Sequence, residues 1–358
     1  MRKQIFLILL FVWILVPQSF AVHSPDIEIL NAYNLRMKGN IDDSRKLLES
    51  ILSKDSTNAM AHYEMARLKH YLLIGGGEVK TEDILTSINK AVTYDAKNIT
   101  YAYYKAIASF INAFMAMQTG NTGVREKINE TCSQLKKVLS MKPDYHEASL
   151  YLVEIYGMLP KEMGGDSLKA IEYADKLVTK NDFFGSKAKA ALLPQNSDLV
   201  KFWMDRLEME KKNPDILTEV GKAYLYKQDP KNAEKYFDEA IKSDPSRNIL
   251  ILDLARYHIM VVMQNKDLAK AELPLAKVCI ERYLKSSPEP IIPLKAYAKG
   301  LMALTEMFLG NKAEADKLVE EAKKLDNHFS RATGIPTLLL FDPPDQISHH
   351  YFSFFTPF

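Results

Sequence analysis

The chain has 358 residues, of which 47% are hydrophobic and 10% aromatic, and this composition excludes an intrinsically disordered protein. Its 47 basic and 45 acidic residues almost cancel, so bulk charge gives no reason to expect nucleic acid as a partner. The 2 cysteines exclude a disulfide-stapled miniature domain and a Cys-rich zinc site.

The N-terminal segment predicts export from the cytoplasm. Met1-Arg2-Lys3 is a short positive region, Ile5 to Val16 is an apolar run, and the small residues Ser19 and Ala21 suit a signal-peptidase site. The apolar run would span about 18 Å of helix, well short of the roughly 30 Å core of a membrane. We therefore expect residues 1–21 to be a cleaved signal peptide rather than an anchor. The protein is then expected to be periplasmic or secreted, with no stable membrane span after cleavage.

From Asp26 to His328, paired helical patterns follow one another along the chain. Each pair starts from a small or apolar residue in its first helix and ends at a proline or polar stop after its second. The fifth pair, Asp182 to Pro214, is degenerate, with a short first helix expected around Ala188 to Leu192. Several pairs have extra residues between their two helices. The first helices of the other pairs are anchored at Ala32, Ala66, Ala106, Leu152, Gly221, Ala255 and Ala303.

The sixth pair, Leu217 to Pro245, has the most complete pattern. Gly221 is followed at fixed spacings by Tyr224, Ala233, Phe237, Ala240 and Pro245. Small residues allow two helices to cross closely, aromatic residues fill the space beside the crossing, and proline stops the second helix. This arrangement resembles the tetratricopeptide repeat (TPR), a helix-turn-helix unit that stacks into superhelical arrays. The resemblance implies an all-α fold over residues 22–328: a TPR-like α-solenoid of about eight units with enlarged turns between helices.

The remaining segment, residues 329–358, differs in character. It is rich in proline and ends in HHYFSFFTPF. An exposed aromatic tail would favour aggregation, so this tail is expected to be docked. Two interpretations stay open: it caps the apolar end of the last repeat, or it occupies a groove of the array or of a partner.

Patterns for catalysis and metal binding are incomplete. His146-Glu147 begins a zinc-protease motif, but Leu150 stands where the second histidine would be needed. His349-His350 is a weak metal candidate, because two adjacent histidines in a tail seldom form a dedicated site. We therefore predict no catalytic residues, no metal and no cofactor. Cys132 and Cys279 are expected to be free and mostly buried thiols, because they fall on second helices four units apart.

The TPR resemblance implies that first helices line a concave groove. When the family's groove positions are transferred to this sequence one repeat at a time, they fall mainly on aromatic residues and on a few basic residues. Such a surface suits an extended peptide, a partner protein or a small solute. The alternative is that half of these side chains simply pack between neighbouring first helices. The predicted groove residues are Tyr33, Tyr63, Arg67, Tyr71, Tyr103, Phe110, Tyr156, Lys222, Tyr226, Arg256, Tyr297 and Phe308.

These features predict a non-enzymatic binding or scaffold protein of the cell envelope. It would hold a peptide, a partner protein or a small solute, and it would have no nucleic-acid partner. The resemblance to exported bacterial TPR proteins also leaves open an accessory role in transport or in outer-membrane assembly. A second class of function, an enzyme with a pocket inside the solenoid that no linear motif reveals, is the competing interpretation.

Overall fold

The computed structural model describes residues 24–74, 77–120 and 123–328, so the predicted signal peptide and the predicted tail lie outside the described residues. Within these ranges the chain forms sixteen α-helices and three short 3₁₀ helices, with no strand. The α-helices are α1 (Ser24–Met37), α2 (Ile41–Lys54), α3 (Ala59–Ile74), α4 (Thr81–Tyr94), α5 (Ile99–Gln118), α6 (Val124–Met141), α7 (His146–Met158), α8 (Ser167–Lys180), α9 (Asp182–Ala191), α10 (Leu199–Met209), α11 (Pro214–Tyr226), α12 (Pro230–Ser243), α13 (Leu250–Gln264), α14 (Ala269–Leu284), α15 (Ile292–Phe308) and α16 (Lys312–Leu325). The 3₁₀ helices are η1 (Lys161–Met163), η2 (Pro245–Ile249) and η3 (Lys266–Leu268).

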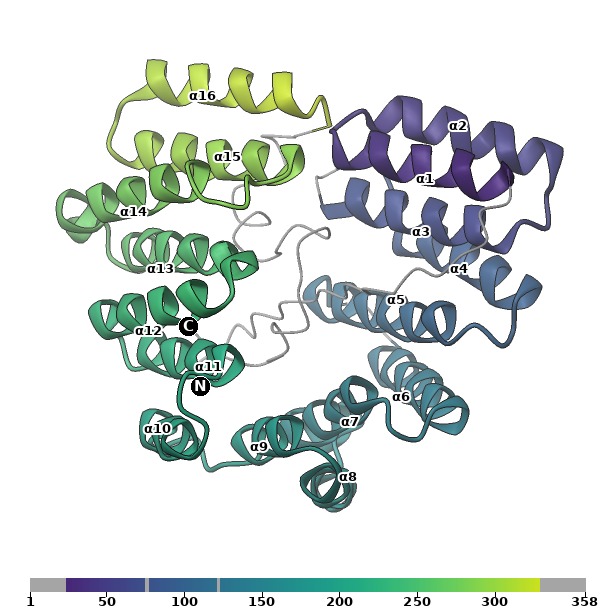
Figure 1. Cartoon of the computed structure of the whole chain (residues 1–358), viewed down its shortest axis with the longest axis horizontal. Helices are drawn as coiled ribbons and strands as arrows, with labels where there is room; N and C mark the ends of the chain where they lie inside the picture. Colours follow the sequence, from purple (N-terminus) through teal and green to yellow (C-terminus); the bar gives the residue numbers. More distant parts are fainter. Residues whose placement is uncertain (1–23, 75–76, 121–122, 329–358) are drawn as a thin grey trace.

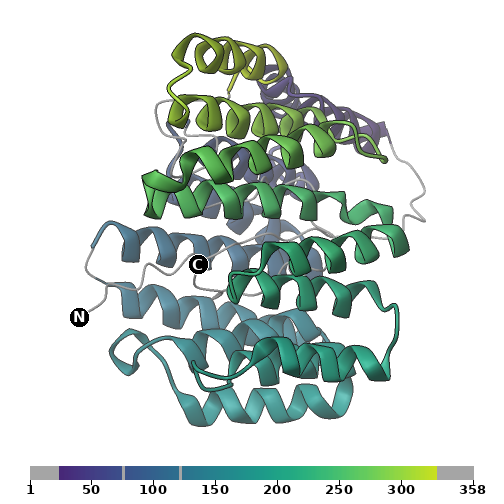
Figure 2. The same cartoon turned by 90° about the vertical axis from the view of Figure 1, so that its left-hand side faces the viewer.

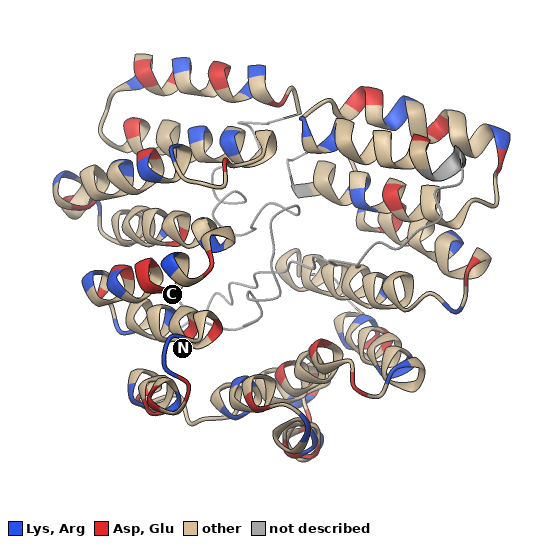
Figure 3. Cartoon of the chain, in the orientation of Figure 1, with Lys and Arg blue, Asp and Glu red and all other residues tan. Residues whose placement is uncertain are grey.

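The helix pairs follow one another around a ring (Figure 1). The odd-numbered helices, which come first in each pair, lie on the inner side of the ring, and the even-numbered helices lie on the outer side. Lys, Arg, Asp and Glu are closely spaced on outer helices such as α2, α12 and α16, whereas the inner helix α5 is almost free of them (Figure 3). Inner helices contact neighbours on several sides, so they are apolar nearly all round, and outer helices bury a single stripe.

The α11–α12 pair shows why the sequence pattern produces this unit. Asn213 and Asp229 each accept hydrogen bonds from backbone N–H groups in the first turn of the helix that follows, and a proline occupies the first position of each helix. A Cβ atom on Gly221 would overlap the ring of Phe237, so only glycine permits this close crossing. The predicted stop is confirmed, because α12 ends just before Asp244-Pro245.

Two of the expected units differ in detail. In the fifth, α9 begins at Asp182, not near Ala188, because the Asn181 side chain accepts a hydrogen bond of 2.9 Å from the backbone N–H of Phe184 and caps the helix there. The two helices of this pair do not pack closely against each other, since α9 packs mainly against α7 and α8 while α10 packs against α11. In the third unit, the extra residues mainly lengthen α5 and α6, which have 20 and 18 residues.

The two ends of the described array meet, and both views show α15 and α16 beside α1 and α2 (Figure 2). The Tyr71 hydroxyl of α3 donates a hydrogen bond to Asp326, which follows α16. Asp42 of α2 accepts from the Asn327 amide at 3.3 Å and lies 3.2 Å from the His328 ring. A Cβ atom on Gly39 would come within 2.5 Å of the Leu325 carbonyl oxygen. The array therefore closes on itself through a polar seam.

Candidate functional site

Cations and tyrosine rings gather on the inner helices α1 and α3. The Arg36 side chain is fully buried and forms an ion pair of 2.7 Å with Glu64, whose second carboxylate oxygen lies 3.3 Å from Arg67. The guanidinium groups of Arg36 and Arg67 lie 5.3 and 5.4 Å from the centre of the Tyr33 ring. Arg67 also lies 5.6 Å from the Tyr63 ring centre. We name these five residues the arginine–tyrosine cluster.

Further rings extend the arginine–tyrosine cluster onto α5. The Tyr63 ring lies 4.9 Å from that of Tyr101 and 5.3 Å from that of Tyr104. Tyr104 is joined in turn to His70 of α3, since its hydroxyl lies 3.1 Å from the His70 Nδ1. Burial raises the pKa of the Tyr104 phenol, which therefore stays neutral. The result is a continuous row of aromatic rings over three successive inner helices, in which Tyr101 and Tyr104 are buried.

Burial divides the arginine–tyrosine cluster into a support and an accessible part. Arg36 and Glu64 are buried, whereas Tyr33, Tyr63 and Arg67 are half-buried. Because the shared Glu64 carboxylate fixes both guanidinium groups, the half-buried side chains are held in place before any ligand arrives. Such a surface can stack on apolar or aromatic groups and direct hydrogen bonds from Arg67.

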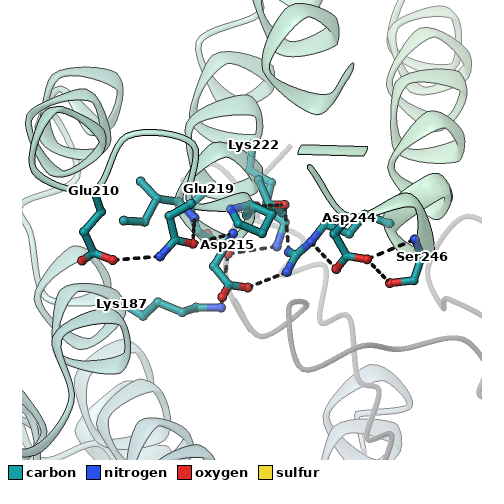
Figure 4. A network of polar contacts seen from close by, with 12 residues as sticks. Lys187, Glu210, Asp215, Glu219, Lys222, Asp244 and Ser246 are labelled. Atoms are coloured by element: carbon teal, nitrogen blue, oxygen red, sulfur yellow. Dashed lines mark hydrogen bonds and ion pairs between the residues drawn. The ribbon is translucent and has the colours of Figure 1, made fainter. Parts of the chain in front are cut away.

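The inner helices α9, α11 and α13 hold a different kind of polar group (Figure 4). Glu219 of α11 accepts from two lysines, with Lys187 Nζ at 3.3 Å and Lys222 Nζ at 3.2 Å. On α13, Arg256 forms an ion pair of 3.1 Å with Asp253. We name these five residues the lysine–carboxylate cluster. In it, each cation contacts a carboxylate.

Burial and charge act in opposite directions on the pKa values in the lysine–carboxylate cluster. Burial alone would raise the pKa of Glu219, but the charges of Lys187 and Lys222 outweigh it and the pKa is lowered. For Lys222, burial lowers the pKa and the Glu219 carboxylate opposes that effect without cancelling it. The group is therefore a compact, nearly neutralised structural network.

Arg247 joins this region to the next repeat. It is buried in η2, and its guanidinium contacts Asp215 at 2.9 Å, Asp244 at 3.0 Å and the Thr218 hydroxyl at 3.2 Å. Asp215 and Asp244 are labelled in Figure 4 beside the lysine–carboxylate cluster. Since Asp215 and Thr218 belong to α11, Arg247 fixes the angle at which α13 leaves the sixth repeat.

The predicted groove residues fall into several environments. Tyr33, Tyr63 and Arg67 belong to the arginine–tyrosine cluster, while Lys222 and Arg256 belong to the lysine–carboxylate cluster. Tyr226 is half-buried at the end of α11, and Phe308 is half-buried against the C-terminal core. The fully packed members, with exposed fractions of 3% or less, are Tyr103, Phe110 and Tyr297. These three match the alternative interpretation, in which such side chains pack between helices.

Tyr71 and Tyr156 lie away from the expected groove. Tyr71 is at the seam, where it contacts Asp326. Tyr156 lies between the outer helices α6 and α8, because its ring stacks on Tyr173 of α8 at 6.2 Å and Lys136 of α6 lies 5.5 Å from its centre. Tyr156 is near the end of α7, where the enlarged turn lets its side chain reach the outer layer.

Sequence reasoning missed the partners of the predicted cations. Glu64, Lys187 and Glu219 were outside the predicted set, although Glu64 lies one helical turn before Arg67 and Glu219 one turn before Lys222. That spacing is the signal that could have found two of them, because residues three apart on a helix are neighbours. Lys187 gave no local signal, since it comes from the degenerate fifth unit.

Two comparisons place the chain among known proteins. The sequence profile described as "Tetratricopeptide repeat" matches residues 214–247, which contain α11 and α12. The sixth helix pair is therefore a tetratricopeptide repeat. The other helix pairs of the described chain have the same all-α arrangement. A search of curated proteins finds no match.

Three solved structures that resemble the chain are described as TPR proteins. A tetratricopeptide repeat protein from Parabacteroides merdae is 17% identical, with 88% of this chain and 98% of that chain covered and a TM-score of 0.37. The thermophilic TPR protein TTC0263 from Thermus thermophilus is 16% identical, with coverage of 65% and 98% and a TM-score of 0.40. YrrB, described as a TPR protein with an unusual peptide-binding site, is 14% identical, with coverage of 61% and 85% and a TM-score of 0.28.

Among the residues that the structure describes, no group of three or more His, Cys, Asp or Glu side chains could hold a metal, and His349-His350 lies outside them. No described helix is both long and apolar enough to cross a membrane. Cys132 and Cys279 are free and buried, as predicted. Burial raises the pKa of the Cys132 thiol, and raises that of Cys279 to about 11, so both thiols stay protonated near neutral pH.

Proposed function

We propose that this TPR protein is an exported, non-enzymatic adaptor that holds an extended peptide segment of a partner protein on its inner helices. The TPR fold itself suggests a role in protein–protein interaction. The observation that supports a specific site is the arginine–tyrosine cluster, where two guanidinium groups contact one tyrosine ring and share one buried carboxylate.

The composition of the arginine–tyrosine cluster favours a peptide over a small polar solute. Tyr and Arg are enriched among the residues that contribute most to protein–protein affinity, because Tyr buries a large area with little loss of side-chain entropy and Arg donates several directional hydrogen bonds. The half-buried Tyr33 and Tyr63 come from neighbouring repeats, and the buried rings of Tyr101 and Tyr104 support Tyr63 from the next repeat. An extended peptide can contact several repeats at once, whereas a small solute would contact one.

A peptide-display selection on the full chain tests this proposal. The selected peptide's affinity is then measured for the native chain and for the variants Tyr33→Ala and Arg67→Ala. We expect each variant to weaken binding by about tenfold or more, since loss of a binding hot spot costs about 2 kcal/mol. Tyr224→Ala, on α11 away from the cluster, is the matched control. Equal affinity of the selected peptides for all variants would contradict the proposal.

Export rests on the N-terminal sequence and needs its own measurement. We expect the protein in the envelope fraction to begin at Val22 when its N-terminus is read by mass spectrometry, because Ser19 and Ala21 define the cleavage site. Recovery of the uncleaved chain from the cytoplasm would contradict this part of the proposal and leave the peptide site unaffected.

A further inference from the structure

The outer layer of the ring contains a cleft that the proposed function does not use. Two hollows of about 830 Å³ and 280 Å³ lie between α6 and α8, and both are bounded by the side chain of Lys136. We name them together the basic cleft. Its cationic lining residues are Arg125, Lys136, Lys161, Lys169, Lys176 and Lys180.

The charge of the basic cleft is strongly one-sided. Among its lining residues within the described chain, Asp166 is the single carboxylate, and it pairs with Lys169 at 2.8 Å. Lys176 pairs with Glu172 at 2.6 Å on the exposed side of α8. Arg125, Lys136 and Lys161 have no carboxylate within ion-pair distance in the part of the chain that the structure describes. A cleft lined by one sign of charge concentrates its field and attracts the opposite charge.

Two tyrosines hold the lysines in position. The rings of Tyr156 and Tyr173 stack at 6.2 Å. Lys136 of α6 and Lys169 of α8 approach the Tyr156 ring to 5.5 and 5.4 Å, and Lys176 approaches the Tyr173 ring to 5.5 Å. Cation–π contacts thus draw ammonium groups from two helices toward one ring. Lys169 and Lys176 are also paired with carboxylates, so Lys136 is the ammonium group beside these rings that has no carboxylate partner within the described chain.

The enlarged turn between α7 and α8 forms one wall of the basic cleft. The backbone N–H of Gly165 donates to the Pro160 carbonyl at 3.0 Å, and that of Asp166 donates to the Tyr156 carbonyl at 2.8 Å. A Cβ atom on Gly165 would overlap the Leu159 carbonyl oxygen, so glycine is required for this tight path. The wall is therefore built into the fold before a ligand arrives.

The cations form two rows that define the length of the basic cleft. Arg125 and Lys136 are about three turns apart on α6, as are Lys169 and Lys180 on α8, which corresponds to about 16 Å. Arg125 and Lys169 line the larger hollow, and Lys180 lines the smaller one. The two rows therefore run in the same direction on either side of the cleft. An extended peptide of about five residues covers this length.

We propose that the basic cleft is a second docking surface, which binds an extended acidic segment of a partner protein. Leu168, which lines the cleft and is 79% exposed, offers an apolar contact beside the cations. A peptide that alternates carboxylates with apolar side chains satisfies both, whereas a free phosphate leaves Leu168 exposed to water. The cleft is on the outer helices, so it operates independently of the arginine–tyrosine cluster.

Fluorescence anisotropy on the full chain tests the proposal, with a fluorescein-labelled peptide of alternating glutamate and leucine of about five residues as the probe. We expect the double variant Lys136→Glu/Lys161→Glu to weaken binding by about tenfold or more, and added salt to weaken binding to the native chain. Lys136→Gln/Lys161→Gln should give a smaller loss. The matched control is Lys270→Glu/Lys312→Glu, which makes the same charge change at exposed positions on the outer helices α14 and α16.

Several outcomes would overturn the proposal. Unchanged affinity in Lys136→Glu/Lys161→Glu, or an equal loss in the α14–α16 control, would remove the basic cleft as the binding site. Displacement of the probe by inorganic phosphate at the probe's own concentration would indicate a simple anion site. Tighter binding of a single-stranded oligonucleotide of equal charge would indicate nucleic acid. A large loss of probe affinity in Arg67→Ala would show that the probe binds at the inner helices instead. Unchanged affinity in that variant supports two separate surfaces.

Discussion

The two polar clusters on the inner helices use the same repeat geometry for different purposes. In the arginine–tyrosine cluster, two cations share one carboxylate and rest against tyrosine rings, and part of the group is half-exposed. In the lysine–carboxylate cluster, Lys187 and Lys222 likewise share the Glu219 carboxylate, while Arg256 pairs with Asp253. The difference lies in the half-buried rings of Tyr33 and Tyr63, which place an aromatic face beside Arg67. The comparison agrees with the proposed peptide site in the first repeats and indicates a cohesive role for the later cluster.

Arg36→Ala should have the largest effect on stability. It leaves the buried Glu64 carboxylate with only Arg67 among the partners described here, and breaking a buried ion pair costs about 3–5 kcal/mol. The free energy of unfolding from urea titration measures this loss. Replacing both partners, as in Arg36→Met/Glu64→Leu, should recover most of it. A loss below 1 kcal/mol, roughly the value of an exposed pair, would show that this ion pair does not support the cluster.

Arg247→Ala should cost about 2–3 kcal/mol of unfolding free energy, because charge-assisted hydrogen bonds to Asp215 and Asp244 are lost. The loss is smaller than for Arg36 since both aspartates are partly exposed, with side-chain exposures of 27% and 32%. The same urea titration measures it. If Arg247→Ala also abolished binding of the selected peptide while the protein remained folded, the division between binding and cohesion would be wrong.

Glu219→Gln should cost about 2 kcal/mol near neutral pH, as one charge-assisted interaction is weakened. The folded-state pKa of Glu219 is lowered below its ordinary value of 4.5 by the two lysines, despite burial. Its ionised form therefore stabilises the fold above about pH 4.5, and this contribution is lost as the pH falls through the lowered pKa. The stability difference between native chain and variant should shrink in acid, whereas Glu281→Gln, at an exposed position on α14, should show a small difference throughout. If the stability difference between the native chain and Glu219→Gln grew in acid, the predicted direction of the pH dependence would be wrong.

Tyr71→Phe should have the smallest effect, about 1 kcal/mol, because it removes one hydrogen bond to Asp326 at the seam. The seam lies outside both clusters, so binding of the selected peptide should be unchanged within error. Hydrogen exchange should become faster in α1, α2 and α16 and stay unchanged in α9–α13. Faster exchange in the lysine–carboxylate cluster would mean that the seam and the later repeats respond as one unit.

The sequence predicted the helix pairs well because their determinants are local. Gly221 against Phe237, the caps at Asn213 and Asp229, and the stop at Pro245 all act within one unit. The degenerate fifth unit was placed too late along the chain, because its start depends on the Asn181 cap and on packing against α7 and α8, which the TPR pattern does not contain.

The candidate sites were predicted less completely because they depend on contacts between repeats. Tyr33 and Arg67 were expected, and the structure brings them into contact although they are 34 residues apart in the sequence. Glu64, which was not expected, holds Arg67 and Arg36 beside the Tyr33 ring. Tyr156 matches a groove position in sequence, yet its partners Cys132, Lys136 and Tyr173 come from outer helices. The pairing of Lys187 with Glu219 and the contact of Tyr71 with Asp326 depend on the curvature of the whole array, which no single repeat encodes.

The polar seam between Asp42, Tyr71 and residues 326–328 limits how this array can change in length. An open solenoid can gain or lose a unit by duplication or deletion, since its ends are independent of each other. Here one full circuit of the ring brings the last helix back to the first, so the rotation contributed by each pair and the number of pairs must agree. Inserting or deleting one pair would shift α16 along or away from α2, and the enlarged turns between helices would have to absorb the mismatch.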